Sequence, residues 1–170
     1  MMKHLVRKLR KAILDERTYK KDFIYLINEK VLAKSGSEKD VRHEYKMAKY
    51  LRKKGISIPR AYGLIKIDFL DAKLIPPFKP VTTWFFLMEK IQGKEIKELQ
   101  GAELKSALRQ RKRELEKVLE LGITPYDALY ERNSLLGKNN KLYLIDFKSW
   151  RKAPREKLDA FYLNLLQYSL

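Results

Sequence analysis

The chain has 170 residues, enough for one ordinary domain, or two small lobes sharing a core, without stabilising disulfides. It contains no cysteine and two histidines, which excludes thiolate chemistry and leaves almost no soft ligands for zinc. The net charge of +17 predicts either attraction to phosphates on nucleic acids, nucleotides or acidic lipids, or a solvated, thermophile-like surface. No run of 18 apolar residues and no signal-type apolar centre occur, so we expect a cytoplasmic protein.

The chain begins with a segment that is typical of a short basic amphipathic helix. In residues 3–15, Leu5, Leu9 and Ile13 recur at helical spacing among lysines and arginines. Such a helix can touch a membrane surface or RNA, or it can pack its apolar side against the neighbouring lobe. The sequence favours packing, because many surface helices share this pattern.

Strand-like patterns dominate the rest of the first half. Four runs are predicted as strands: residues 22–28, 30–34, 61–69 and 82–89. The first two are joined at Asn28-Glu29 as in a tight hairpin. A loop with Pro76, Pro77 and Pro80 separates the last two.

Helices are predicted within and after these strands. Ser37 and Asp40 resemble a capping box that opens a helix over 38–54, which Gly55 can end. Gly93 marks a change to mostly helical sequence. The later elements are helices over 102–121 and 155–168, with a hairpin between them formed by 134–136 and 141–146 and turned at 137–140.

Three polar residues in the second half are spaced as a phosphate-handling site requires. Asp146 ends the apolar run 142–145, where a carboxylate is costly to bury without a partner. Asn133 precedes the other strand of that hairpin, so both side chains are expected to converge on one Mg²⁺, with phosphate oxygens completing its shell. Asp127 lies just upstream and offers a base-like group. Alternatively, the three are turn and strand-end residues.

A cation and a carboxylate in the first half form a second candidate pair. Lys34 ends the strand-like run 30–34, and Glu44 lies on the apolar stripe of the next helix, in line with Val41 and Ala48. A carboxylate on a core stripe requires a cationic partner, and Lys34 is the natural candidate. Alternatively, Glu44 is solvated at the edge of the stripe.

These segments resemble the protein-kinase-like superfamily, in particular its small atypical members, the lipopolysaccharide core kinases and the RIO-type minimal kinases. The similarity is most specific at 122–136 and at Leu-Tyr-Leu-Ile-Asp-Phe, residues 142–147, and it extends over residues 23–165. It implies an α+β, two-lobed protein-kinase-like fold. A small antiparallel-sheet N-lobe is then expected over 1–90, and a hinge with a truncated helical C-lobe over 91–170.

The resemblance also implies roles for individual residues. Asp127 corresponds to the catalytic aspartate, and Asn133 and Asp146 to the magnesium ligands. Their separation of 13 residues is the usual one in that superfamily. Lys34, paired with Glu44, corresponds to the residue that orients the phosphates of ATP.

The segment 84–93 resembles the last strand and hinge of the kinase N-lobe. Met88 stands in the gatekeeper place, and the backbone groups of Glu89 and Ile91 are then expected to face an adenine. Alternatively, Met88 and Ile91 are plain core residues.

Three departures from the kinase pattern bear on activity. No glycine precedes Gly36, so the Gly-rich loop that covers the phosphates is absent. Ala128 stands where the catalytic aspartate is usual, so either the loop has one extra residue and Asp127 serves, or the base is missing. Lys148 replaces the glycine after Asp-Phe, which places a cation next to the metal site.

The sequence therefore predicts an ATP-dependent, Mg²⁺-assisted kinase, of serine/threonine type, that acts on a hydroxyl of a protein or of a lipopolysaccharide core sugar. The positive charge favours a phosphate-bearing acceptor, and it suits contact with RNA or a peripheral position on the inner face of a membrane. One alternative is a pseudokinase that binds nucleotide without turnover. The other is a purely RNA-binding basic domain.

Overall fold

The computed structural model of the chain describes residues 2–14, 18–19, 21–69 and 81–167. Two compact units are present. Unit 1 comprises Met1–Lys46 and Ala61–Lys90, and unit 2 comprises Met47–Arg60 and Ile91–Leu170. Among the described helices, none combines the length and apolar character needed to cross a bilayer.

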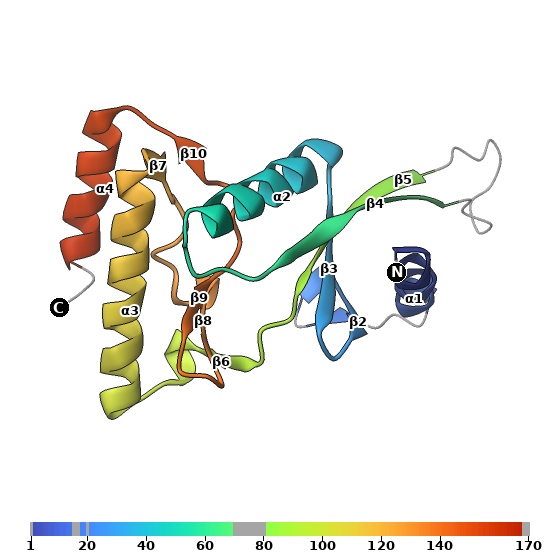
Figure 1. Cartoon of the computed structure of the whole chain (residues 1–170), viewed down its shortest axis with the longest axis horizontal. Helices are drawn as coiled ribbons and strands as arrows, with labels where there is room; N and C mark the ends of the chain where they lie inside the picture. The colour runs from blue at the N-terminus through green and yellow to red at the C-terminus, as the bar shows by residue number, and fades with distance from the viewer. Residues whose placement is uncertain (1, 15–17, 20, 70–80, 168–170) are drawn as a thin grey trace. The chain divides into compact units, whose positions relative to one another are not determined.

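Unit 1 is built around an antiparallel sheet with the strand order β1-β2-β3-β5-β4 (Figure 1). Its elements are α1 (Met2–Leu14), β1 (Thr18–Tyr19), β2 (Lys21–Asn28), β3 (Val31–Gly36), the first part of α2 (Glu38–Lys53), β4 (Ala61–Phe69) and β5 (Val81–Glu89). The four strands predicted from the sequence and both helices are confirmed. The predicted proline-rich loop lies outside the described residues.

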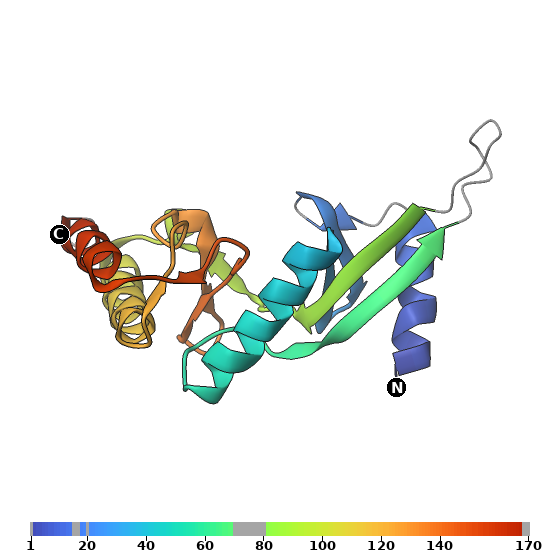
Figure 2. The ribbon, with the colours of Figure 1, turned by 90° about the horizontal axis from the view of Figure 1, so that it is seen from above.

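One face of this sheet is apolar and carries α1 (Figure 2). Because strand side chains alternate with period two, Ala33, Phe85 and Leu87 point to the same face. They are buried in one cluster with residues of the other strands and with Leu5, Leu9 and Ala12 of α1. The apolar side of α1 thus packs on the sheet of its own unit, rather than on a neighbouring lobe as the sequence suggested.

The opposite face of the same strands meets the first part of α2. Lys34 of β3 pairs in register with Phe86 of β5, and both side chains point away from α1. The Phe86 ring makes an edge contact with Tyr45, with ring centroids 6.0 Å apart. The amide of Asp40 donates to Ser37 Oγ at 3.2 Å, which confirms the predicted cap at the start of α2.

Unit 2 contains a small sheet of order β6-β8-β9, a β7–β10 pair and two helices, α3 and α4, which lie side by side (Figures 1 and 2). Its elements are β6 (Gly93–Glu95), the 3-10 helix η1 (Ile96–Glu98), α3 (Gly101–Glu120), β7 (Ile123–Thr124), the 3-10 helix η2 (Glu131–Asn133), β8 (Ser134–Gly137), β9 (Leu142–Leu144), β10 (Arg151–Lys152) and α4 (Arg155–Gln167). Both predicted helices and the predicted hairpin are present. The sequence did not predict β1, β6, β7, β10, η1 or η2, since segments of two or three residues show no periodicity.

Gly93 allows β6 to approach β8 closely. A Cβ atom at this position would lie 2.1 Å from the carbonyl oxygen of Leu136, which is backbone and cannot move aside cheaply. Gly93 pairs with Gly137 across the two strands. The lack of a side chain at Gly93 therefore lets β6, which follows closely after β5 in the chain, pair with β8 of the β8–β9 hairpin.

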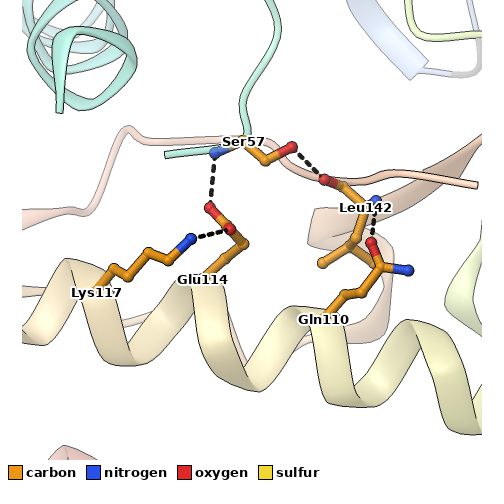
Figure 3. Close-up of polar contacts among 5 residues, drawn as sticks. All are labelled: Ser57, Gln110, Glu114, Lys117 and Leu142. Carbon is orange, nitrogen blue, oxygen red and sulfur yellow. Dashed lines mark hydrogen bonds and ion pairs between the residues drawn. The ribbon is translucent and has the colours of Figure 1, made fainter. Parts of the chain in front are cut away.

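The lobe boundary that the sequence places at residue 90 stays a prediction. Residues 47–60 belong to unit 2 because of a set of hydrogen bonds at Ser57 (Figure 3). Its amide donates to Glu114 Oε2 at 2.7 Å, its hydroxyl donates to the Leu142 carbonyl, and its own carbonyl accepts from Leu144 N at 2.9 Å. Gln110 of α3 accepts from Leu142 N at 3.0 Å, so polar side chains of α3 hold both segments.

Candidate functional site

Asn133 is the centre of the cluster predicted in the second half. Its side chain is only 5% exposed, and its Nδ2 donates to the backbone carbonyl of Asp127 at 2.8 Å. Because the amide nitrogen is used in this way, Oδ1 is the atom left to act as an oxygen ligand. The backbone carbonyl of Asn133 accepts from Ile145 N at 2.9 Å. Asn133 thus joins the loop that carries Asp127 to the residue before Asp146.

Asp146 lies in an irregular segment after β9 rather than at the end of a strand. The sequence placed it at the end of the hairpin strand, but β9 stops at Leu144. Its φ angle of 66° is left-handed, a conformation that costs a non-glycine residue of the order of 1 kcal/mol and persists only where the surroundings impose it. The following turn is closed by Trp150 N, which donates to the Phe147 carbonyl at 3.2 Å. Such strained residues cluster at functional sites.

The carboxylate of Asp127 has a neutral hydrogen-bond donor. The indole Nε1 of Trp150 donates to Asp127 Oδ1 at 3.0 Å. The Asp127 side chain is half-buried, whereas Trp150 is completely buried. Within the described part of the chain, Asp127 forms no ion pair. The printed partner of this carboxylate is therefore a neutral donor rather than a cation.

Ala128, which stands in the place usual for a catalytic aspartate, is fixed by a buried arginine. The Arg111 guanidinium on α3 is 6% exposed and its Nη2 donates to the Ala128 carbonyl. Burial lowers the pKa of Arg111, and the Glu131 carboxylate opposes that shift. Residues 127 and 128 are thus each held at the backbone carbonyl, one by Asn133 and the other by Arg111.

The donor set of this cluster fits a hard cation such as Mg²⁺. Asn133 and Asp146 offer an amide oxygen and a carboxylate, and Mg²⁺ usually takes one or two such ligands together with water and phosphate oxygens. Among the described residues, no group of three or more histidine, cysteine or acidic side chains gathers as a self-sufficient metal cage. A divalent cation here would take its remaining ligands from water or from phosphate oxygens.

Unit 1 contains the predicted pair of Lys34 and Glu44. Lys34 Nζ lies 2.9 Å from Glu44 Oε1, and the two side chains are 19% and 3% exposed. The sheet alternation directs Lys34 toward α2, and helical periodicity places Glu44 among the buried positions of that helix. The ion pair is confirmed, and the role of these residues toward ATP stays a prediction.

The predicted hinge residues lie at the end of β5 and just after it. Met88 is half-buried and shares the sheet face of Lys34, because both residues occupy the alternate positions of their paired strands. Glu89 is half-buried, and Ile91, the first residue of the second segment of unit 2, is buried. Lys90 N donates to the Lys30 carbonyl at 2.9 Å, which fixes the end of the strand. Adenine contact by this segment stays a prediction.

A solved structure shows a similar fold. A crystal structure of WbdD at 2.2 Å matches with a TM-score of 0.54 and 14% sequence identity, over 85% of this chain and 34% of that chain. The fold is kinase-like. The predicted α+β, two-lobed kinase-like class is thereby confirmed, and the chain spans about a third of the length of WbdD. No family model and no curated protein matches the sequence.

The sequence did not identify the two side chains that support the Asp127 loop. The sequence does offer a hint of the role of Trp150. It is one of only two tryptophans and follows closely after Asp146-Phe147. Arg111 offers no such hint, since it is one arginine among many on a basic helix. Both act across the fold, on residues 23 and 17 positions away.

Proposed function

We propose that this protein is an ATP-dependent phosphotransferase that phosphorylates a hydroxyl group with the help of Mg²⁺. The observation that carries the proposal is the hydrogen-bonded cluster of Asp127, Asn133 and the chain entering Asp146. Turn residues without a common role would not need a buried asparagine bonded to one loop by its side chain and to the other by its backbone. A base-like carboxylate beside two hard-oxygen ligands is what phosphoryl transfer requires.

The residues take the following roles in the proposed reaction. The acceptor oxygen attacks the γ-phosphorus of ATP, the bond from that phosphorus to the β–γ bridging oxygen breaks, and ADP leaves. Asp127 orients the acceptor hydroxyl and takes its proton. Asn133 and Asp146 hold the cation, which neutralises charge on the phosphates when bound. In unit 1, Lys34 binds phosphate oxygens and Glu44 fixes its ammonium group.

Removal of the carboxylate at Asp146 tests this proposal. The Asp146→Asn variant is expected to lose about two to three orders of magnitude in Mg²⁺-dependent ADP release from ATP, since a preorganised charge in the transition state is lost. Asp159→Asn is the matched control, because Asp159 is an exposed aspartate of unit 2 on α4. Equal ADP release by both variants would overturn the proposal.

A second candidate, a pseudokinase, is favoured by the backbone at Ala128. Arg111 donates to the Ala128 carbonyl. Ala128 is buried and carries only a methyl group at the position usual for the catalytic aspartate. A pseudokinase would bind ATP, seen as a Mg²⁺-dependent rise in melting temperature, without releasing ADP. An RNA-binding domain would show no such rise, and its RNA affinity would fall steeply with salt.

The basic side of α1 suggests where an acceptor-bearing surface docks. Because the apolar side of α1 is buried in unit 1, its exposed side carries a basic set together with His4, and the described helix has no acidic residue. The basic set comprises Lys3, Arg7, Lys8, Arg10 and Lys11. Near an anionic bilayer each such cation contributes about 1 kcal/mol. The helix has no phenylalanine, tyrosine or tryptophan, and its one ring for stacking on RNA bases is His4, so we favour an anionic lipid surface.

Vesicle binding tests the docking surface. The double variant Lys8→Glu/Lys11→Glu is expected to lose sedimentation with vesicles containing phosphatidylglycerol, while vesicles of phosphatidylcholine alone bind neither protein. The control Lys105→Glu/Arg109→Glu makes the same charge change at exposed positions of α3. An equal loss in both double variants would show attraction by net charge alone and contradict a specific role of α1.

A further inference from the structure

Trp150 is completely buried, yet the only polar atom of its side chain donates to the candidate catalytic carboxylate. The indole Nε1 lies 3.0 Å from Asp127 Oδ1, across 23 residues of sequence. A buried indole N–H needs an acceptor, and a backbone carbonyl is the commonest one available. Here the acceptor is instead the side chain that the proposed reaction requires.

The indole is held in place independently of Asp127. Trp150 N donates to the Phe147 carbonyl at 3.2 Å, and the two rings pack edge to face with centroids 5.1 Å apart and an interplanar angle of 82°. Phe147 is itself buried. Since Phe147 directly follows Asp146, the turn that fixes the candidate metal ligand also fixes the indole.

The charge of the donor matters for what Asp127 can do. A lysine or arginine at this place would hold the carboxylate equally well but would neutralise it and weaken it as a proton acceptor. The neutral indole engages one oxygen and leaves the other with its lone pairs. It also restrains a side chain that stands one residue earlier in the loop than the usual catalytic aspartate.

We propose that Trp150 is a positioning residue that aims the Asp127 carboxylate for proton acceptance and compensates for its shifted place in the loop. This inference rests on the proposed phosphotransferase function. The tryptophan touches no reacting atom, so it acts on the orientation of Asp127 alone. Loss of its N–H should therefore lower kcat and leave the KM for ATP unchanged.

The indole N–H can be removed without changing the shape of the ring. Trp84→Phe leaves Trp150 as the only tryptophan of the chain. In that background, incorporation of 3-benzothienylalanine replaces the N–H of residue 150 with sulfur. We expect kcat to fall about tenfold, the usual weight of a hydrogen bond to a charged group, with the KM for ATP within about twofold and the melting temperature nearly unchanged. An unchanged kcat would overturn the proposal.

A second measurement separates this inference from the proposed function. With ¹⁵N-labelled tryptophan in the Trp84→Phe protein, the single indole resonance should move upfield and exchange faster with solvent when Asp127→Ala removes the acceptor. If that resonance does not move, the hydrogen bond is absent and the inference fails whatever the activity. If it moves but the Trp84→Phe protein releases no ADP while nucleotide binding persists, the phosphotransferase proposal fails, and with it the positioning role.

Discussion

The two units support their candidate functional groups in opposite ways. In unit 1, the buried carboxylate of Glu44 is matched by the ammonium of Lys34, and the partners lie ten residues apart on adjoining elements. In unit 2, the half-buried carboxylate of Asp127 is matched by a neutral indole that lies 23 residues away. Burial decides the difference, because a carboxylate at 3% exposure needs a cation, whereas one that still meets water does not.

The comparison shows how one small fold can hold two acids for different purposes. Glu44 keeps the Lys34 ammonium in one position, and the ammonium in turn balances the charge of the Glu44 carboxylate. Asp127 is held without a cation, because Trp150 and Asn133 contribute only neutral N–H donors to it and to its backbone. The predictions below change one partner at a time, beginning with the largest expected effect.

Lys34→Met should be the most damaging of these changes. Glu44 would stay buried but lose the ammonium of Lys34, which is expected to lower the free energy of unfolding by about 3–5 kcal/mol in a denaturant titration. Adding Glu44→Leu to the variant should recover most of the loss, because no unpaired charge then remains. The control is Lys66→Met, which removes a half-exposed lysine of the same unit. Equal losses from Lys34→Met and Lys66→Met would contradict a buried ion pair.

Arg111→Met should lower activity more than stability. The variant loses the hydrogen bond to the Ala128 carbonyl but also removes a buried charge, so the free energy of unfolding is expected to change by less than about 1 kcal/mol. The rate of ADP release should fall about tenfold, since the Asp127 loop is held less firmly. Arg113→Met, at an exposed position of the same helix, is the control. An activity equal to that of the control would show that the loop needs no such support.

Ser57→Ala tests the attachment of residues 47–60 to unit 2. Loss of the hydroxyl that donates to the Leu142 carbonyl should lower the free energy of unfolding by about 1 kcal/mol and speed amide exchange at Leu144, which bonds to the Ser57 carbonyl. Ser106→Ala, at an exposed position of α3, should change neither quantity noticeably. Unchanged exchange at Leu144 in the Ser57 variant would contradict the attachment.

Thr82→Val should have the smallest effect and extends the comparison to a surface carboxylate. The Thr82 hydroxyl, 2.6 Å from Asp68 Oδ1, lowers the pKa of Asp68, and Lys66 adds to the shift. A lowered pKa in the folded state contributes stability above the ordinary pKa of aspartate, and that contribution is lost as the pH falls through the folded pKa. In the variant, an NMR titration should show the pKa of Asp68 rising toward its ordinary value. Thr83→Val is the control, and a pKa that stays low in Thr82→Val would exclude the hydroxyl as the cause.

Much of the fold and half of the candidate site follow from local sequence patterns. Strand alternation and the helical stripe each reach a few residues, and together they predicted the contact between Lys34 and Glu44. The hairpin pattern likewise predicted that Asn133 and Asp146 flank paired strands. Local patterns did not predict the bonds that join residues 47–60 to unit 2, because these bonds link Ser57 to positions 57 and 85 residues further along the chain.

By itself, the sequence determined the order of elements, the face of the sheet that carries Lys34 and the residues that offer hard oxygens. The tertiary structure alone decided which groups meet Asp127 and its loop. Trp150 and Arg111 reach the Asp127 loop from a turn and a helix that no periodicity connects to it. Hydrogen bonds depend on distances of about 3 Å, and such distances between remote residues are set only when both elements pack on one core.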